Sequence, residues 1–179
     1  DMPDLNYNNP DVRQAAKDAA GHWLELGLDG FRMDAAVHIY GAHEFRQQED
    51  SETANITWWN EFASYCESIN PDVYLVGEVW QDDKVLENYV QPFDTKFDFA
   101  IQQKILNCVQ KGMAVPGFGD SLSVAIENIQ NKYDGVDANY LNGIFGANHD
   151  QDRIASSVNS LDKARQIAAV YMTLPGNPY

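Results

Sequence analysis

The chain has 179 residues, which fits one domain, and an apolar content of 44%, which is enough to form a folded core. Its 12 Lys and Arg residues are outnumbered by 27 Asp and Glu residues, so the formal net charge is −15. This charge argues against nucleic-acid and anionic-membrane partners, and no apolar run is long enough for a membrane-spanning helix. A solvated acidic surface is the simplest explanation of the charge, and a neutral or cationic small molecule is a partner that it permits.

The cysteines and the first residue bear on the state of the thiols and on whether the sequence is part of a longer polypeptide. Cys66 and Cys108 each fall on an apolar helical stripe, so we expect buried free thiols rather than a disulfide. Residue 1 is Asp rather than Met, and no secretory signal is visible, so we expect the sequence to begin inside a longer polypeptide. The redox compartment is left open.

Signals for a helix come first along the chain. Asn9 can cap it, Pro10 suits its first turn, and Gly27 can end it in the left-handed conformation. A strand at 30–35 and a long polar loop at 41–56 are predicted next. The apolar residues at helical spacing in the first helix are Val12, Ala15, Ala16, Ala19, Ala20 and Trp23.

Helix and strand patterns then alternate to the end of the chain. The continuous apolar run at 73–79 is typical of a parallel strand that is buried on both faces. It follows a predicted helix at 58–69, whose inward residues are Trp59, Phe62, Ala63, Cys66 and Ile69. The later elements are a short helix at 84–89, a strand at 96–98, helices at 100–112 and 121–133, a strand at 142–147, a helix from the cap at Ser160 to Met172 and an extended segment at 174–179.

This alternation predicts an α/β fold with a parallel sheet and helices outside it. About five strands are predicted, whereas a closed eight-stranded barrel needs roughly 250 residues. The pattern alone therefore fits a small open doubly wound sheet and a piece of a barrel equally well.

Three acidic residues share one position relative to these strands. Asp34, Glu78 and Asp150 each follow a predicted parallel strand, and catalytic groups gather at the carboxyl ends of such strands. A single acid there is most often part of a structural ion pair, because burying it alone is costly. Three at the same end favour a shared active site.

Two of the acids lie in different predicted surroundings. Arg32 lies two residues before Asp34, so both side chains lie on one face of the strand, where the guanidinium would keep Asp34 ionised. Apolar neighbours surround Glu78 in the sequence, and desolvation there would favour the protonated form that a general acid needs. Glycoside hydrolysis uses one ionised and one protonated carboxyl group in a shared site. The alternative for Arg32 is a simple buried ion pair.

The histidines and tryptophans allow further predictions. His149, next to Asp150, is well placed to bind sugar hydroxyls, whereas His38 could bind substrate or metal. A zinc or iron site of a metal-dependent hydrolase, built from His38, His149, Asp150 and Asp152, competes with this interpretation but lacks paired helical metal spacing. Trp80, close to Glu78, is either a wall of the pocket or part of the core, and Trp59 is expected in the core.

Five segments resemble the alpha-amylase family, in the same order. Residues 30–38 (GFRMDAAVH), 76–80 (VGEVW) and 145–150 (FGANHD) resemble its segments on barrel strands four, five and seven. Residues 2–6 (MPDLN) are similar to the end of its inserted second domain, and residues 176–179 (GNPY) to the entry of strand eight. The resemblance implies a (β/α)8 barrel of which residues 1–179 form the C-terminal part, about strands four to eight, with residues 1–8 as the tail of the inserted domain.

The resemblance also implies a retaining mechanism and a set of site residues. Asp34 would be the nucleophile, Glu78 the acid/base and Asp150 the residue that stabilises the transition state. Arg32 would hold Asp34, and the other substrate-binding residues would be His38, Trp80, Asn148 and His149. The two catalytic carboxyl groups of a retaining enzyme lie about 5–5.5 Å apart.

The implied substrate is an α-glucan such as starch or maltodextrin, cut mainly at α-1,4 bonds. An α-1,6-glucosidase, a neopullulanase, a transglycosylase and a non-catalytic binding relative are the alternatives. Val37 stands where the family usually has Lys, which leaves the leaving-group subsite open. The main-chain carbonyl of His38 is an implied ligand of a structural Ca²⁺ whose other ligands mostly lie outside this chain. The implied context is a secreted bacterial protein in which the rest of the polypeptide completes the barrel.

Overall fold

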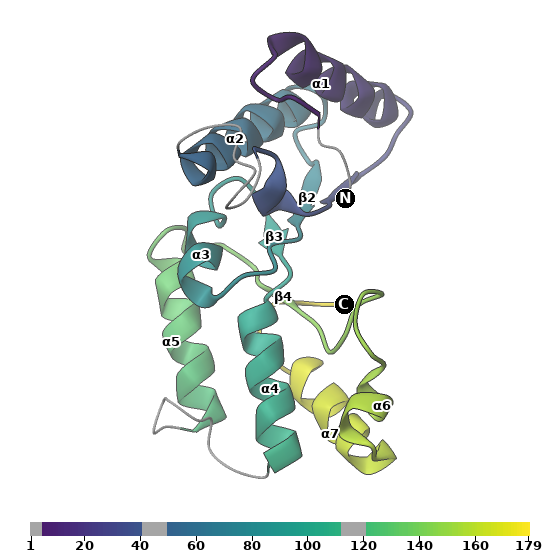
Figure 1. Ribbon diagram of the computed structural model, residues 1–179, viewed down its shortest axis with the longest axis vertical. Helices are drawn as coiled ribbons and strands as arrows, with labels where there is room; N and C mark the ends of the chain where they lie inside the picture. The colour runs from purple at the N-terminus through teal and green to yellow at the C-terminus, as the bar shows by residue number, and fades with distance from the viewer. Residues whose placement is uncertain (1–4, 41–49, 112–120) are drawn as a thin grey trace. The chain divides into compact units, whose positions relative to one another are not determined.

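The computed structural model describes residues 5–40, 50–111 and 121–179 (Figure 1). Helices alternate with short parallel strands, in two compact units. The first unit is Asp1–Trp80 with Gln91–Asp94, and the second is Gln81–Val90 with Thr95–Tyr179. No helix within the described ranges is long and apolar enough to cross a membrane.

The first unit contains α1 (Pro10–Glu25), β1 (Gly30–Met33), the 3-10 turn η1 (Ala36–His38), α2 (Ser51–Ile69) and β2 (Tyr74–Gly77). The Asn9 side chain accepts a hydrogen bond from the Asp11 N–H, and Gly27 has a φ of 93°, so both predicted ends of α1 are confirmed. Trp23 does not lie on the buried stripe, because half of its surface is exposed. The buried residues of α1 are Ala20, Gly21 and Leu24.

The core of this unit is aromatic. From α2, Trp58, Trp59 and Phe62 pack on one another and are at most 4% exposed. Phe62 also contacts Phe31 of β1, and Trp59 contacts Phe93. Such rings bury large apolar areas and so fix α2 against β1 and the segment that carries Phe93.

Helix α2 begins seven residues earlier than its hydrophobic pattern predicts. The Asp50 side chain caps the helix by accepting from the Thr53 N–H, and Asn55 is buried in the first turns. The prediction of loop structure at 51–56 is therefore wrong. The rest of that predicted loop, 41–49, lies outside the described residues.

The second unit contains the remaining elements. They are α3 (Asp83–Asn88), β3 (Thr95–Lys96), α4 (Phe99–Lys111), α5 (Leu122–Asp134), β4 (Gly143–Ile144), α6 (Ile154–Val158), α7 (Leu161–Tyr171) and β5 (Asn177–Pro178). Helix α4 packs against both α5 and α7 (Figure 1). Strands β4 and β5 are parallel, and a parallel bridge joins Phe97 to Gly143. The parallel α/β prediction is confirmed, although the strands are shorter than predicted and α6 was not predicted.

Candidate active site

Strands β1 and β2 bring two of the three predicted acids together. The strands pair in parallel, with Arg32 opposite Val76 and Met33 opposite Gly77. Beyond the paired residues, the Glu78 N–H donates to the Met33 carbonyl at 2.9 Å. Asp34 and Glu78 therefore lie just beyond the carboxyl ends of two neighbouring strands, as expected for parallel pairing.

Arg32 contacts both carboxylates with one guanidinium group. Its Nη1 binds Asp34 Oδ1, and its Nη2 lies 2.8 Å from Glu78 Oε1. The second contact is an ion pair rather than a hydrogen bond, because Glu78 Oε1 is buried without hydrogen-bond geometry to any partner. The contact with Asp34 was expected from the sequence, and the bridge to Glu78 was not. The planar guanidinium group suits contact with two carboxylates, since it offers several N–H groups in fixed directions.

The two carboxylates differ in exposure. The Asp34 side chain is 77% exposed, whereas that of Glu78 is 9% exposed. Glu78 Oε2 accepts a hydrogen bond of 3.1 Å from the Ala35 N–H. The predicted burial of Glu78 is confirmed, and its carboxylate also contacts a guanidinium and a backbone N–H.

A sharp turn after Asp34 aims this backbone N–H. Ala35 has φ 45° and ψ 45°, the left-handed region that is uncommon for residues other than glycine. The Ala36 N–H then donates to the Glu78 carbonyl at 3.0 Å, and the Ala36 carbonyl accepts from Trp59 Nε1 at 2.8 Å. Trp59 is therefore a core residue, as expected, and also fixes the turn beside the carboxylates. Sequence reasoning missed the role of this turn.

Asp150 lies in the second unit, in the segment that follows β4. Its backbone N–H donates to Asn148 Oδ1 at 3.1 Å, and its Oδ2 lies 3.3 Å from His149 Nε2. The Asn148 Nδ2 group is buried and has no hydrogen-bond partner in the part of the chain that the structure describes. The expected substrate contacts of Asn148, His149 and Asp150 stay predictions. The convergence of Asp150 with Asp34 and Glu78 stays a prediction.

The other predicted site residues belong to the first unit. His38 is exposed at the end of η1, where its backbone N–H donates to the Ala35 carbonyl at 2.8 Å. Trp80 follows Glu78 by two residues and is 51% exposed, so it is not part of the core. The expected substrate contacts of His38 and Trp80 stay predictions.

A metal site needs several ligating side chains gathered in one place. Across 5–40, 50–111 and 121–179, no three His, Cys, Asp or Glu side chains gather in a way that could hold a metal ion. Within the second unit, His149, Asp150 and Asp152 do not form such a group, and His38 lies in the first unit. The Ca²⁺ contact expected at the His38 carbonyl stays a prediction, because most of its ligands are expected outside this chain.

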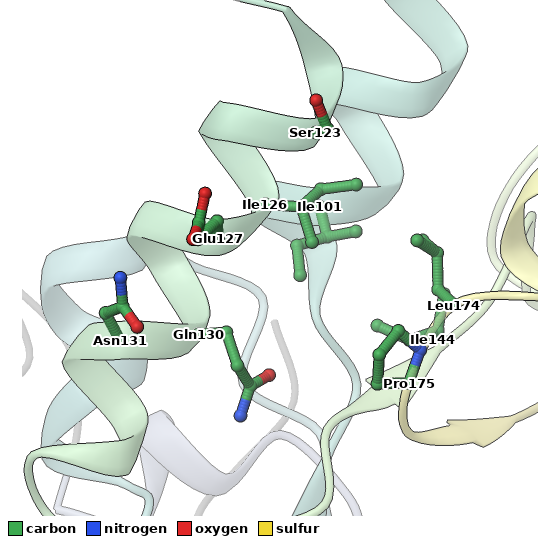
Figure 2. A pocket seen from close by; sticks show the side chains of 9 residues that line it. All are labelled: Ile101, Ser123, Ile126, Glu127, Gln130, Asn131, Ile144, Leu174 and Pro175. Carbon is green, nitrogen blue, oxygen red and sulfur yellow. The ribbon is translucent and has the colours of Figure 1, made fainter.

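A separate apolar pocket of about 300 Å³ lies within the second unit (Figure 2). Helix α5 forms one side of it, with Ile126 and Gln130, and Leu174 and Pro175 lie opposite. None of the predicted site residues lines it, and its lining is largely aliphatic. It is therefore distinct from the candidate active site.

Parallel strands with carboxylates beyond their carboxyl ends are typical of the active sites of α/β proteins. A family model described as the alpha-amylase catalytic domain matches residues 1–179, which is the whole chain. The chain therefore belongs to the alpha-amylase family of glycosidases. Its α/β fold matches part of the catalytic barrel of that family.

Individual relatives agree with the family match. Alpha-amylase 3 of Dictyoglomus thermophilum is 40% identical over 182 residues, which cover 100% of this chain and 33% of that protein. A 4-alpha-glucanotransferase of Thermotoga neapolitana is 33% identical over 178 residues, 98% of this chain and 35% of its own length. The crystal structure of the alpha-amylase from H.orenii has a TM-score of 0.84 and 37% identity, over 99% of this chain and 34% of that one. The chain thus spans about a third of each of these relatives.

Proposed function

We propose that the polypeptide containing this chain is a retaining glycoside hydrolase that cleaves mainly α-1,4-glucosidic bonds in starch or maltodextrins. The observation that carries the proposal is the Arg32 bridge between Asp34 and Glu78. One guanidinium reaches both carboxylates, so they are close enough to act on one glycosidic bond from a shared site. Retaining glycosidases need such a pair at about 5–5.5 Å.

In the first proposed step, Glu78 donates a proton to the glycosidic oxygen while an Asp34 oxygen attacks the anomeric carbon. The bond from this carbon to the leaving oxygen breaks, and the shortened glucan departs with a hydroxyl group. Arg32 and the Ala35 N–H bind the carboxylate form of Glu78. The acid in this step is the carboxyl form of Glu78, which the second step regenerates.

In the second proposed step, Glu78 accepts a proton from water as the water oxygen attacks the anomeric carbon. The bond to Asp34 breaks, both carboxyl groups return to their starting state, and two inversions give net retention. Asp150 would bind hydroxyl groups of the distorted sugar.

Three further residues are proposed to bind substrate. The Asn148 amide carries a buried donor without a partner among the described residues, and such a donor is costly unless a ligand or water pairs with it. His149 lies beside Asp150 and offers further polar atoms to the same sugar. The exposed indole of Trp80 offers a stacking face near Glu78.

The place of the chain in the whole protein is also a proposal. Strands four to eight of the barrel are the part that the order of the motifs favours, with residues 1–8 as the end of an inserted domain. Residues 1–4 lie outside the described ranges. We also propose secretion from a bacterium and a Ca²⁺ ligand at the His38 carbonyl. If that carbonyl binds Ca²⁺, a chelator should lower the melting temperature of the complete polypeptide, and Ca²⁺ should restore it.

Transglycosylation is the second candidate function. The likeness to a 4-alpha-glucanotransferase over 98% of this chain favours it. A sugar hydroxyl would then replace water in the second step. Product analysis on maltooligosaccharides distinguishes hydrolysis from transglycosylation, because a transferase forms chains longer than its substrate. Parallel assays on isomaltose and pullulan would detect the α-1,6 specificities.

The direct test of the proposed roles is the Asp34→Asn variant of the complete polypeptide. Loss of the nucleophile should lower turnover of maltooligosaccharides by several orders of magnitude while the far-ultraviolet circular dichroism spectrum stays unchanged. Glu78→Gln should have a similar effect on natural substrates. Near-normal turnover of Asp34→Asn would refute the assignment.

A further inference from the structure

We infer that Gln102 and Gln151 are positioning residues that fix the orientation of Asp150. This inference rests on the proposed function, in which Asp150 stabilises the transition state. It concerns only the second unit, where both glutamines and Asp150 lie.

The first step of the argument is the burial of Gln102. It lies on the inward face of α4, between the buried Ile101 and Ile105, and is itself only 3% exposed. A buried amide is costly unless its hydrogen bonds are satisfied. Its Nε2 donates to the Gly146 carbonyl at 2.9 Å and to Gln151 Oε1 at 3.3 Å. Both partners flank the segment from Ala147 to Asp150.

The second step is the path from Gln151 to Asp150. Gln151 Oε1 accepts a second hydrogen bond, of 3.3 Å, from the Asn148 N–H. Asn148 Oδ1 in turn accepts from the Asp150 N–H at 3.1 Å. An unbroken series of hydrogen bonds therefore runs from the interior of α4 to the backbone of Asp150.

This series has a consequence for the site. Within this chain the side chains of His149 and Asp150 are more than half exposed, so packing inside the chain alone does not hold them. The Gln102 and Gln151 amides replace that packing, since they tie the segment to a rigid helix. Side chains that act on a transition state lose efficiency when they move by even 1 Å, by up to about 100-fold.

The test uses Gln102→Met and Gln151→Met in the complete polypeptide, with maltooligosaccharides as substrate. Each change keeps side-chain length and removes the amide. We expect kcat to fall about tenfold or more, with a smaller change in KM, because the transition state loses more stabilisation than the bound ground state does. The matched control is Gln103→Met, an exposed neighbour on α4, which should retain the wild-type kcat. If Gln102→Met fails to fold, the partly exposed Gln151→Met decides.

A second background separates positioning from general stability. In Asp150→Asn, the Gln151→Met change should lower kcat by less than about twofold, because the residue that it positions is already disabled. An equal loss in both backgrounds, or no loss in the wild type, would overturn the inference while leaving the proposed function intact. If Asp150→Asn alone kept normal kcat, the proposed role of Asp150 would fail, and this inference with it.

Discussion

Arg32 joins the two carboxylates of the first unit. Two carboxylates at neighbouring strand ends repel each other, and the repulsion is stronger away from bulk water. The guanidinium offsets it by contacting Asp34 and Glu78 at once. The same contacts fix the direction of both side chains, so Arg32 both balances charge and sets geometry.

Replacing Arg32 with Lys should separate these two contributions. Lysine keeps the positive charge but offers a single ammonium group, which cannot bind both carboxylates as a planar fork does. We expect kcat/KM to fall about 10- to 100-fold, as for the loss of one hydrogen bond to a charged group. Steady-state kinetics on maltooligosaccharides measure this. Arg165→Lys, at an exposed pair with Asp162, is the control and should change little. Wild-type kinetics in Arg32→Lys would contradict the account.

The sequence predicted part of this arrangement. The contact of Arg32 with Asp34 follows from the two-residue period of a strand. The contact with Glu78 depends on the register between β1 and β2, and a strand with a continuous apolar run lacks the alternation that would specify register. The role of Ala35 was equally hidden, because an alanine in the left-handed conformation has no sequence signal. Gln102 did carry a signal, since it interrupts an apolar helical face.

At the scale of elements, strand β2 must lie very close to the segment that carries Phe93. A Cβ atom added at Gly77 would lie 2.5 Å from the Phe93 ring. Gly77 also directly precedes Glu78, so any shift of the strand there moves the carboxylate. The glycine is required by this close approach.

Gly77→Ala should therefore destabilise the fold by about 1–3 kcal/mol, through overpacking against Phe93. Urea unfolding measures the change. In a Phe93→Leu background the smaller side chain leaves room, so the same substitution should cost less. An equal cost in both backgrounds would show that the ring does not set the limit.

Elements with local signals were predicted well, and those that depend on tertiary packing were not. The Asn9, Ser121 and Ser160 caps mark helix starts that the structure has. The start of α2 was missed because Asp50 caps polar residues that carry no apolar period. Strand β1 is short because the chain turns sharply at Ala35, two residues after the strand ends at Met33. The five-residue α6 is too short for periodicity to reveal.

For the whole molecule, a buried lysine links stability to pH. Lys96 is fully buried, with Nζ 3.5 Å from the centre of the Tyr133 ring and 3.1 Å from the Tyr140 hydroxyl. Burial lowers the pKa of Lys96 from 10.5 to about 7, and the nearby Asp98 opposes this shift only in part. Asp98 itself accepts hydrogen bonds from Tyr133 and Asn142.

Stability should therefore rise with pH above neutrality. Between pH 7 and 9 the unfolded chain binds a proton at Lys96 that the folded chain has largely lost, so raising the pH favours the fold. The unfolding free energy should increase by about 2 kcal/mol over this range relative to Lys96→Met. Urea unfolding followed by circular dichroism at pH 7, 8 and 9 measures it.

The range stops at pH 9 because Cys66 acts in the opposite direction above it. Burial raises the pKa of the Cys66 thiol to about 11 from 9.0, so the folded chain keeps a proton that the unfolded chain loses. A parallel pH dependence in wild type and Lys96→Met would contradict the assignment of the effect to Lys96.

The central claim is that Asp34 attacks the anomeric carbon and Glu78 transfers the proton. The Glu78→Gln variant of the complete polypeptide, treated with α-maltosyl fluoride, tests it most directly. Fluoride leaves without an acid, whereas water attack lacks its base, so the covalent intermediate should accumulate. Mass spectrometry of peptides should locate one maltosyl group on Asp34, and Asp34→Asn/Glu78→Gln should carry none. A maltosyl group on another residue, or release of the inverted β-anomer without an adduct, would contradict the account.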